Sequence, residues 1–204
     1  MGVSRSKPKS KAASRQGRFD VCIVGGAGHV GLPLAVVFAD RGLRVLVYDI
    51  NRASLETIGR GVLPFMEEGG GPLLKKVLKS GSLTLSSDPH DIARADIVII
   101  TIGTPVDEFM NPDTKVMRHC MDDLLPYLGQ DKLIILRSTV YPGTTQWLDK
   151  YLKQSAVRAL VAFCPERVVQ GRAIEEVQKL PQIVSGTTPA AEDGAARLFG
   201  RITK

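Results

Sequence analysis

A glycine-rich segment near the start of the chain has the spacing of a phosphate-binding loop. Gly26, Gly28 and Gly31 form the pattern G-x-G-x-x-G, with His29 and Val30 between the last two glycines. In this pattern the first glycine permits a tight turn, the second lets a diphosphate approach the backbone, and the third allows the following helix to pack closely. Free N–H groups of the first helical turn bind the anion. We therefore expect these five residues to contact a dinucleotide.

An acidic residue occupies the position that distinguishes the two nicotinamide dinucleotides. Asp49 ends the second apolar run, eighteen residues after Gly31. A carboxylate there accepts hydrogen bonds from a ribose 2′-hydroxyl and repels a 2′-phosphate, so the sequence predicts NAD rather than NADP as the cofactor. An ordinary glycine turn and a surface acid would give the same residues, but the preceding strand and following helix favour the cofactor site.

The cysteines and histidines do not have the spacing of a metal site or of a disulfide framework. Cys22, Cys120 and Cys164 lie far apart in the sequence, and His90 and His119 have no partner at ligand spacing. We expect no metal. Cys22 falls within an apolar strand and Cys164 beside a strand end, where a buried thiol packs as a small apolar group. Covalent catalysis by Cys164 is the alternative.

Apolar runs that alternate with helical segments place these residues in space. Uniformly apolar strands separated by helices are typical of a parallel sheet covered on both faces. The sequence predicts an α/β fold of the Rossmann type, with a doubly wound, mostly parallel sheet and helices on both faces. Strands are expected at 19–24, 43–48, 83–85, 97–102, 133–136, 159–163 and 181–185. Helices are expected at 32–39, 52–59, 72–79, briefly after Asp88, at 116–128 and 144–154, and from Thr188 onward.

Polar residues follow three of the predicted strands. They are residues 101–105 (TIGTP), 137–140 (RSTV) and 164–167 (CPER). Ligands bind at the carboxyl ends of parallel strands, so these three segments are expected to meet at one edge of the sheet.

These segments, together with residues 30–35 (VGLPLA), resemble the UDP-glucose/GDP-mannose dehydrogenase family, and the resemblance covers about residues 19–204. It implies oxidation of the C6 alcohol of a nucleotide sugar to a carboxylate, by two hydride transfers to NAD through an enzyme thioester, in the synthesis of polysaccharide precursors. Residues 103–108, 164–168 and 180–184 look closer to dehydrogenases of UDP-N-acetylhexosamines, so UDP-N-acetylmannosamine is the expected substrate. UDP-glucose is the alternative.

The resemblance also implies roles for single residues. Thr104 and Pro105 match the segment beside the nicotinamide. Thr139 matches the threonine of an S-T-V turn that contacts the cofactor and positions the catalytic water and the reacting centre. Glu166 matches a glutamate that orients or activates water for thioester hydrolysis, a task suited to a carboxylate. Glu166 and Thr139 are therefore the predicted catalytic residues.

Other parts of the family pattern are expected beyond Lys204. They are the nucleophilic cysteine, a lysine and an asparagine on a central helix, and a second domain that binds the nucleotide sugar. The resemblance thus implies a chain truncated before the central helix and the second domain, inactive alone, and dimeric only if that remaining part exists. A free-standing NAD-binding module without turnover is the alternative.

The positive charge of the chain is concentrated at its start. Residues 1–18 hold six Lys and Arg residues and no acid, whereas the formal net charge of the whole chain is +6. We expect a disordered basic tail at 1–18 and a neutral Rossmann domain at 19–204. Binding to nucleic acid or to a membrane surface would depend on the tail alone, and residues 1–6 also fit a myristoylation pattern. We expect a cytoplasmic location and neither nucleic-acid nor membrane partners.

Overall fold

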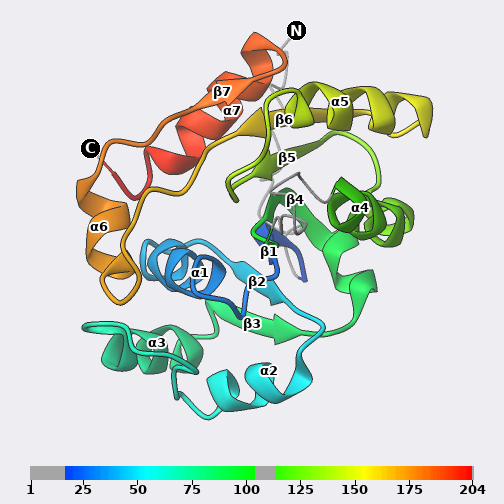
Figure 1. The fold of residues 1–204 in the computed structure, drawn as a ribbon. Helices are drawn as coiled ribbons and strands as arrows, with labels where there is room; N and C mark the ends of the chain where they lie inside the picture. Colours follow the sequence, from blue (N-terminus) through cyan, green and yellow to red (C-terminus); the bar gives the residue numbers. More distant parts are fainter. Residues whose placement is uncertain (1–16, 104–113, 204) are drawn as a thin grey trace, which may run out of the picture.

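A seven-stranded sheet organises the part of the chain that the computed structural model describes, residues 17–103 and 114–203 (Figure 1). Within this part the strand order is β3-β2-β1-β4-β5-β6-β7, and only β7 runs antiparallel to its neighbour. The predicted Rossmann-type, mostly parallel sheet is confirmed. The strands are β1 (Phe19–Val24), β2 (Val45–Tyr48), β3 (Leu83–Ser86), β4 (Ala95–Ile100), β5 (Lys132–Leu136), β6 (Ala159–Phe163) and β7 (Ser185–Gly186).

Helices cover both faces of this sheet. The core on one face includes residues of α1 (Gly31–Asp40), α2 (Arg52–Gly59), α3 (Gly70–Lys79), α6 (Ala173–Lys179) and α7 (Pro189–Phe199). The core on the other face includes residues of the 3₁₀ helix η1 (Pro89–Arg94), α4 (Thr114–Leu128) and α5 (Thr144–Gln154).

Successive strand residues point to opposite faces, which explains why the inner parts of the central strands carry apolar residues on both faces. In β1, Val21 and Ile23 belong to the core under α1, and Cys22 and Val24 belong to the core under α4 and α5. Both sets are almost completely buried. A strand with two covered faces needs an apolar residue at every position, so the alternation of a half-exposed strand is absent.

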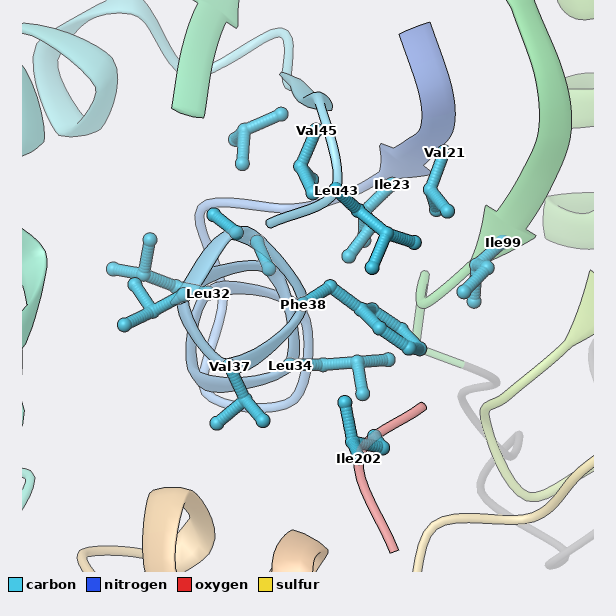
Figure 2. Packing of buried hydrophobic residues seen from close by; sticks show 14 of the residues in the cluster. Val21, Ile23, Leu32, Leu34, Val37, Phe38, Leu43, Val45, Ile99 and Ile202 are labelled. Carbon is cyan, nitrogen blue, oxygen red and sulfur yellow. The ribbon is translucent and has the colours of Figure 1, made fainter. Parts of the chain in front are cut away.

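Helix α1 is buried on nearly every side. Figure 2 shows its Phe38 pointing toward the sheet, near Leu43 and Leu34, with Ile202 beyond them. The Phe38 ring also packs on Phe199 of α7, with 5.8 Å between the ring centroids. Because neighbours surround this helix, its position relative to the glycine loop is fixed by the whole core.

The predicted boundaries differ from the structure at several elements. β4 ends at Ile100, two residues before the prediction, and Thr101, which follows it, donates its hydroxyl to the Val24 carbonyl oxygen at the end of β1. Helix α3 begins at Gly70 rather than at Pro72, after Gly69 with φ +70°. β2 begins at Val45 rather than at Leu43.

The structure differs from the prediction at two places between β6 and α7. Helix α6 was not predicted, and the strand expected at 181–185 is only the two-residue β7, which pairs with β6. Gln182 is held by side-chain hydrogen bonds to Arg137 and to the carbonyl oxygens of Val177 and Leu180. This segment therefore runs past the end of α6 before it reaches the sheet.

Candidate cofactor and catalytic sites

The glycine loop between β1 and α1 requires glycine at specific positions. Gly25 has φ +74°, a conformation that residues with a Cβ rarely adopt. A Cβ at Gly26 would lie 2.7 Å from the Ile23 carbonyl oxygen, and one at Gly31 would lie 2.6 Å from the Cα of Gly26. Around Gly28, by contrast, the nearest atom to a Cβ would be an oxygen at 3.5 Å. The first and third glycines of the pattern are thus needed for packing, and the second leaves the loop surface open.

Thr101, directly after β4, holds this loop from the neighbouring strand. Its Oγ1 donates to the carbonyl oxygen of Val24 at 2.8 Å and lies 3.1 Å from that of Gly25. The Thr101 Oγ1 would also lie 2.8 Å from a Cβ at Gly31. The sequence placed Thr101 at a strand end but did not assign it to the site. Only the pairing of β1 with β4 reveals its contact with the loop.

Asp49 follows β2 and is oriented toward the glycine loop. Its Oδ2 accepts from the Ala27 N–H at 3.0 Å, and its Oδ1 accepts from the Asn51 N–H at 2.9 Å. Asn51 in turn caps α2, since its side chain accepts from the Ser54 N–H. The carboxylate is therefore fixed beside the loop with lone pairs left for a ligand.

A cavity of about 290 Å³ opens beside this carboxylate. The predicted residues Gly28, His29 and Asp49 line it, and the His29 ring stacks on the Phe65 ring with 4.1 Å between centroids and 23° between planes. The full lining is Ala27, Gly28, His29, Asp49, Asn51, Ser54, Pro64 and Phe65. Sequence reasoning missed Asn51, Ser54, Pro64 and Phe65.

These residues fit a dinucleotide. The side of Gly28 that lacks a Cβ provides room for a diphosphate against the backbone, and Asp49 offers acceptors for ribose hydroxyls. Val30, the residue before α1, makes no capping hydrogen bond with its side chain. No capping side chain therefore competes with an anion for the N–H groups at this end of the helix.

A second polar cluster surrounds Glu166, which follows β6. Its Oε2 accepts from Arg137 Nε at 2.9 Å, and Arg137 Nη2 lies 2.6 Å from the same oxygen as an ion-pair contact without a hydrogen bond of its own. Its Oε1 accepts from the N–H groups of Arg167 and Val168 at 2.7 and 3.2 Å. The carboxylate is thus held by one guanidinium and two backbone groups.

The Arg137 guanidinium is itself completely buried. Nη1 donates to the carbonyl oxygen of Cys164 at 3.0 Å and to Gln182 Oε1 at 2.9 Å, and the group lies over the Phe199 ring. Burial lowers the pKa of Arg137, and the adjacent Glu166 carboxylate acts in the opposite direction. Arg137 belonged to a predicted polar segment, but no role was predicted for it.

The remaining predicted residues have different outcomes. Thr139 is exposed after β5, and the hydroxyl of its neighbour Ser138 donates to the Ile102 carbonyl oxygen. Thr104 and Pro105 lie outside the described residues. Cys164 is buried, and burial raises the pKa of its thiol to about 11, so it is protonated at neutral pH. This environment suits packing and does not activate a nucleophile.

Among residues 17–103 and 114–203, no group of three or more His, Cys, Asp or Glu side chains could hold a metal ion. In the same residues, no helix combines the length and apolar character needed to cross a membrane.

Residues 19–203 match the sequence model of the NAD-binding domain of the UDP-glucose/GDP-mannose dehydrogenase family. The UDP-N-acetyl-D-mannosamine dehydrogenase of Salmonella typhi is 31% identical over 193 residues, which cover 89% of this chain and 45% of that protein. The NDP-N-acetyl-D-galactosaminuronic acid dehydrogenase of Ralstonia nicotianae is 30% identical, with 89% and 45% covered.

The fold is similar to that of solved relatives. A UDP-D-ManNAc dehydrogenase from Pyrococcus horikoshii superposes with a TM-score of 0.85 at 29% identity, covering 90% of this chain and 45% of that one. The chain therefore spans slightly less than half the length of these relatives. The match to an NAD-binding domain confirms the predicted cofactor, NAD. From its fold, its glycine loop and this match over nearly its whole length, the chain belongs to the UDP-glucose/GDP-mannose dehydrogenase family.

Proposed function

We propose that this chain is the NAD-binding part of an enzyme that oxidises the C6 alcohol of a UDP-sugar to a carboxylate, for the synthesis of polysaccharide precursors. The observation that carries the proposal is the Asp49 carboxylate, fixed beside a glycine loop in a chain of this family. In that arrangement the backbone binds a diphosphate while the carboxylate binds a ribose. When bound, NAD supplies the hydride acceptor.

We assign Glu166 and Thr139 to the reacting centre on the basis of the family resemblance. Glu166 already accepts from Arg137 and from two backbone N–H groups, so little of its capacity as an acceptor is free. A carboxylate held in this way can orient a water molecule in a fixed direction. We therefore favour an orienting role for Glu166 over removal of a proton.

UDP-N-acetylmannosamine is the substrate we favour. The relatives from Salmonella typhi and Pyrococcus horikoshii are named for it, and the resemblance in segments 103–108 and 164–168 supports the same class. The Ralstonia relative is named for a different N-acetylhexosamine derivative, so the sugar needs a direct test. Formation of NADH should be followed with UDP-N-acetylmannosamine and with UDP-glucose, in the complete enzyme of which we propose this chain to be the NAD-binding part. Turnover of UDP-glucose alone would contradict this choice.

The role of Asp49 can be tested by cofactor binding without turnover. Calorimetric titration of the chain with NAD and NADP should show tighter binding of NAD. In Asp49→Ala, NAD affinity should fall by about tenfold, which corresponds to about 1.4 kcal/mol, and the preference over NADP should narrow. Asp193→Asn, which changes an exposed acid of α7 outside the cavity lining, is the control. An unchanged NAD-to-NADP ratio in Asp49→Ala would remove Asp49 from the site.

A further inference from the structure

Phe65 comes from a segment that the glycine pattern does not include, yet it lies at the glycine loop. It belongs to the connection between α2 and α3, and its ring stacks on His29, which precedes α1. Both residues line the cavity that contains Asp49. A half-buried aromatic ring beside an otherwise polar cavity is a feature that the dinucleotide pattern does not account for.

The Phe65 connection is anchored to the start of α6 and to the segment that precedes it. Glu67 is buried, and its Oε1 accepts from the Ile174 N–H at the start of α6 at 2.7 Å. The N–H of Glu68 donates to the Gly171 carbonyl oxygen at 2.8 Å. A Cβ at Gly70 would lie 2.6 Å from the Leu63 side chain, so the connection is also closely packed where α3 begins. These contacts hold Phe65 in place before any ligand binds.

The cavity lining combines polar and apolar side chains. Asp49, Asn51 and Ser54 provide hydrogen-bonding groups, whereas Pro64 and Phe65 provide apolar surface. A ribose has hydroxyl groups on one edge and C–H groups on its faces, so it can use both kinds of group at once. Apolar surface that a ligand covers adds to its affinity.

We propose that Phe65, supported by His29, forms a preorganised wall that packs against the ribose of the adenosine half of NAD. This inference rests on the proposed function, because it assumes that the dinucleotide binds at the glycine loop. It adds to that function a binding residue from the α2–α3 connection.

The test compares the affinities for NAD and ADP, because ADP carries the adenosine half alone. Phe65→Ala should lower the affinity for both ligands by the same factor, about three- to tenfold, as expected for the loss of one aromatic contact. Phe65→Leu keeps apolar bulk and should retain most of the affinity. His29→Ala removes the other ring of the stack and should also lower the affinity for ADP. Met66→Ala, in the same connection but 86% exposed and outside the cavity lining, is the matched control and should bind both ligands like the wild type.

Different outcomes separate the two proposals. If the wild type binds NAD and ADP but Phe65→Ala and His29→Ala do not change ADP affinity, the wall is wrong and the cofactor site stands. If Phe65→Ala weakens NAD alone, the ring contacts the nicotinamide half and the assignment is overturned. If the wild type binds neither ligand, the proposed function fails together with the wall. Phe65→Leu and His29→Ala keep the test decisive should Phe65→Ala fail to fold.

Discussion

The guanidinium of Arg137 is completely buried, and an arginine at that depth is stable only when acceptors match its donors. Glu166, Gln182 and the Cys164 carbonyl oxygen provide these acceptors from two different connections, after β6 and after α6. The side chain therefore joins segments that have no direct sheet pairing. One consequence is that the orientation of Glu166 depends on a residue that follows β5 as well as on the backbone N–H groups of its own connection.

Replacing Arg137 by Met should strongly destabilise the fold. The substitution leaves Glu166, whose side chain is only 11% exposed, without its guanidinium partner, and breaking a buried pair in this way costs about 3–5 kcal/mol. Urea denaturation measures the change. Arg158→Met is the matched control, because its ion pair with Asp131 is largely exposed and should contribute little.

A double-mutant cycle separates the interaction energy of the Arg137–Glu166 pair from other effects of burial. Glu166→Gln combined with Arg137→Met should cost less than the sum of the two single changes, because neither charge is then left alone. Equal losses for Arg137→Met and Arg158→Met, or strictly additive losses in the cycle, would show that the pair does not stabilise the fold.

At the scale of the element, the contact between α1 and the glycine loop sets the position of the helix terminus that faces the cofactor. Gly31→Ala places a methyl group 2.6 Å from the Gly26 Cα, and such overpacking costs about 1–3 kcal/mol. Displacement of α1 should also lower the affinity for NAD. The control is Gly71→Ala in the first turn of α3, where a Cβ meets nothing within 4 Å.

The two glycine substitutions should have opposite effects on stability. Gly71→Ala is expected to stabilise by about 0.5–1 kcal/mol, because alanine loses less backbone entropy in a helix, and to leave NAD affinity unchanged. Thermal unfolding with and without NAD measures both quantities. If Gly31→Ala bound NAD normally, the close approach of α1 to the loop would be irrelevant to the site.

Elements with local signals were predictable from the sequence. β1 and β5 are apolar apart from Asp20 and Lys132, and helix α7 begins at Pro189, directly after Thr188, where the sequence predicted its start. The glycine pattern and Asp49 were recognisable because their chemistry depends on short, fixed spacings. These features are determined by residues close together in the chain.

Elements held by distant residues were not predictable. The amino end of α6 is bound by Glu67, 107 residues earlier, and no capping side chain precedes the helix. Phe65 lies in a connection whose glycines indicate only an irregular loop, and its place at the cofactor cavity follows from the packing of that connection against α6. A single sequence contains no local signal for such contacts.

At the scale of the molecule, the cofactor site lies where the strand order reverses. The chain proceeds outward from β1 to β2 and β3, then returns to β4 on the other side of β1 and continues to β6 (Figure 1). The connections after β1 and β4 therefore diverge, which leaves room for a ligand at the carboxyl edge. Glu166 follows β6 at the same edge, so both polar clusters face one side of the sheet.

Much of the positive charge of the chain lies at its start. Residues 1–16 contain five of its Lys and Arg residues and no acid, and they have few large apolar side chains. A segment of this composition adds little to a hydrophobic core, so deleting residues 1–16 should change neither the melting temperature nor the affinity for NAD. Any binding of the intact chain to a DNA duplex at low salt should be lost, because such binding depends on the number of phosphates that cations neutralise.

A full-length variant with these five residues changed to Ser is the control for chain length, and it should behave like the deletion. Retained DNA binding in both variants would place a basic surface on the Rossmann domain itself, and weaker NAD binding in the deletion alone would assign the segment a part in the cofactor site.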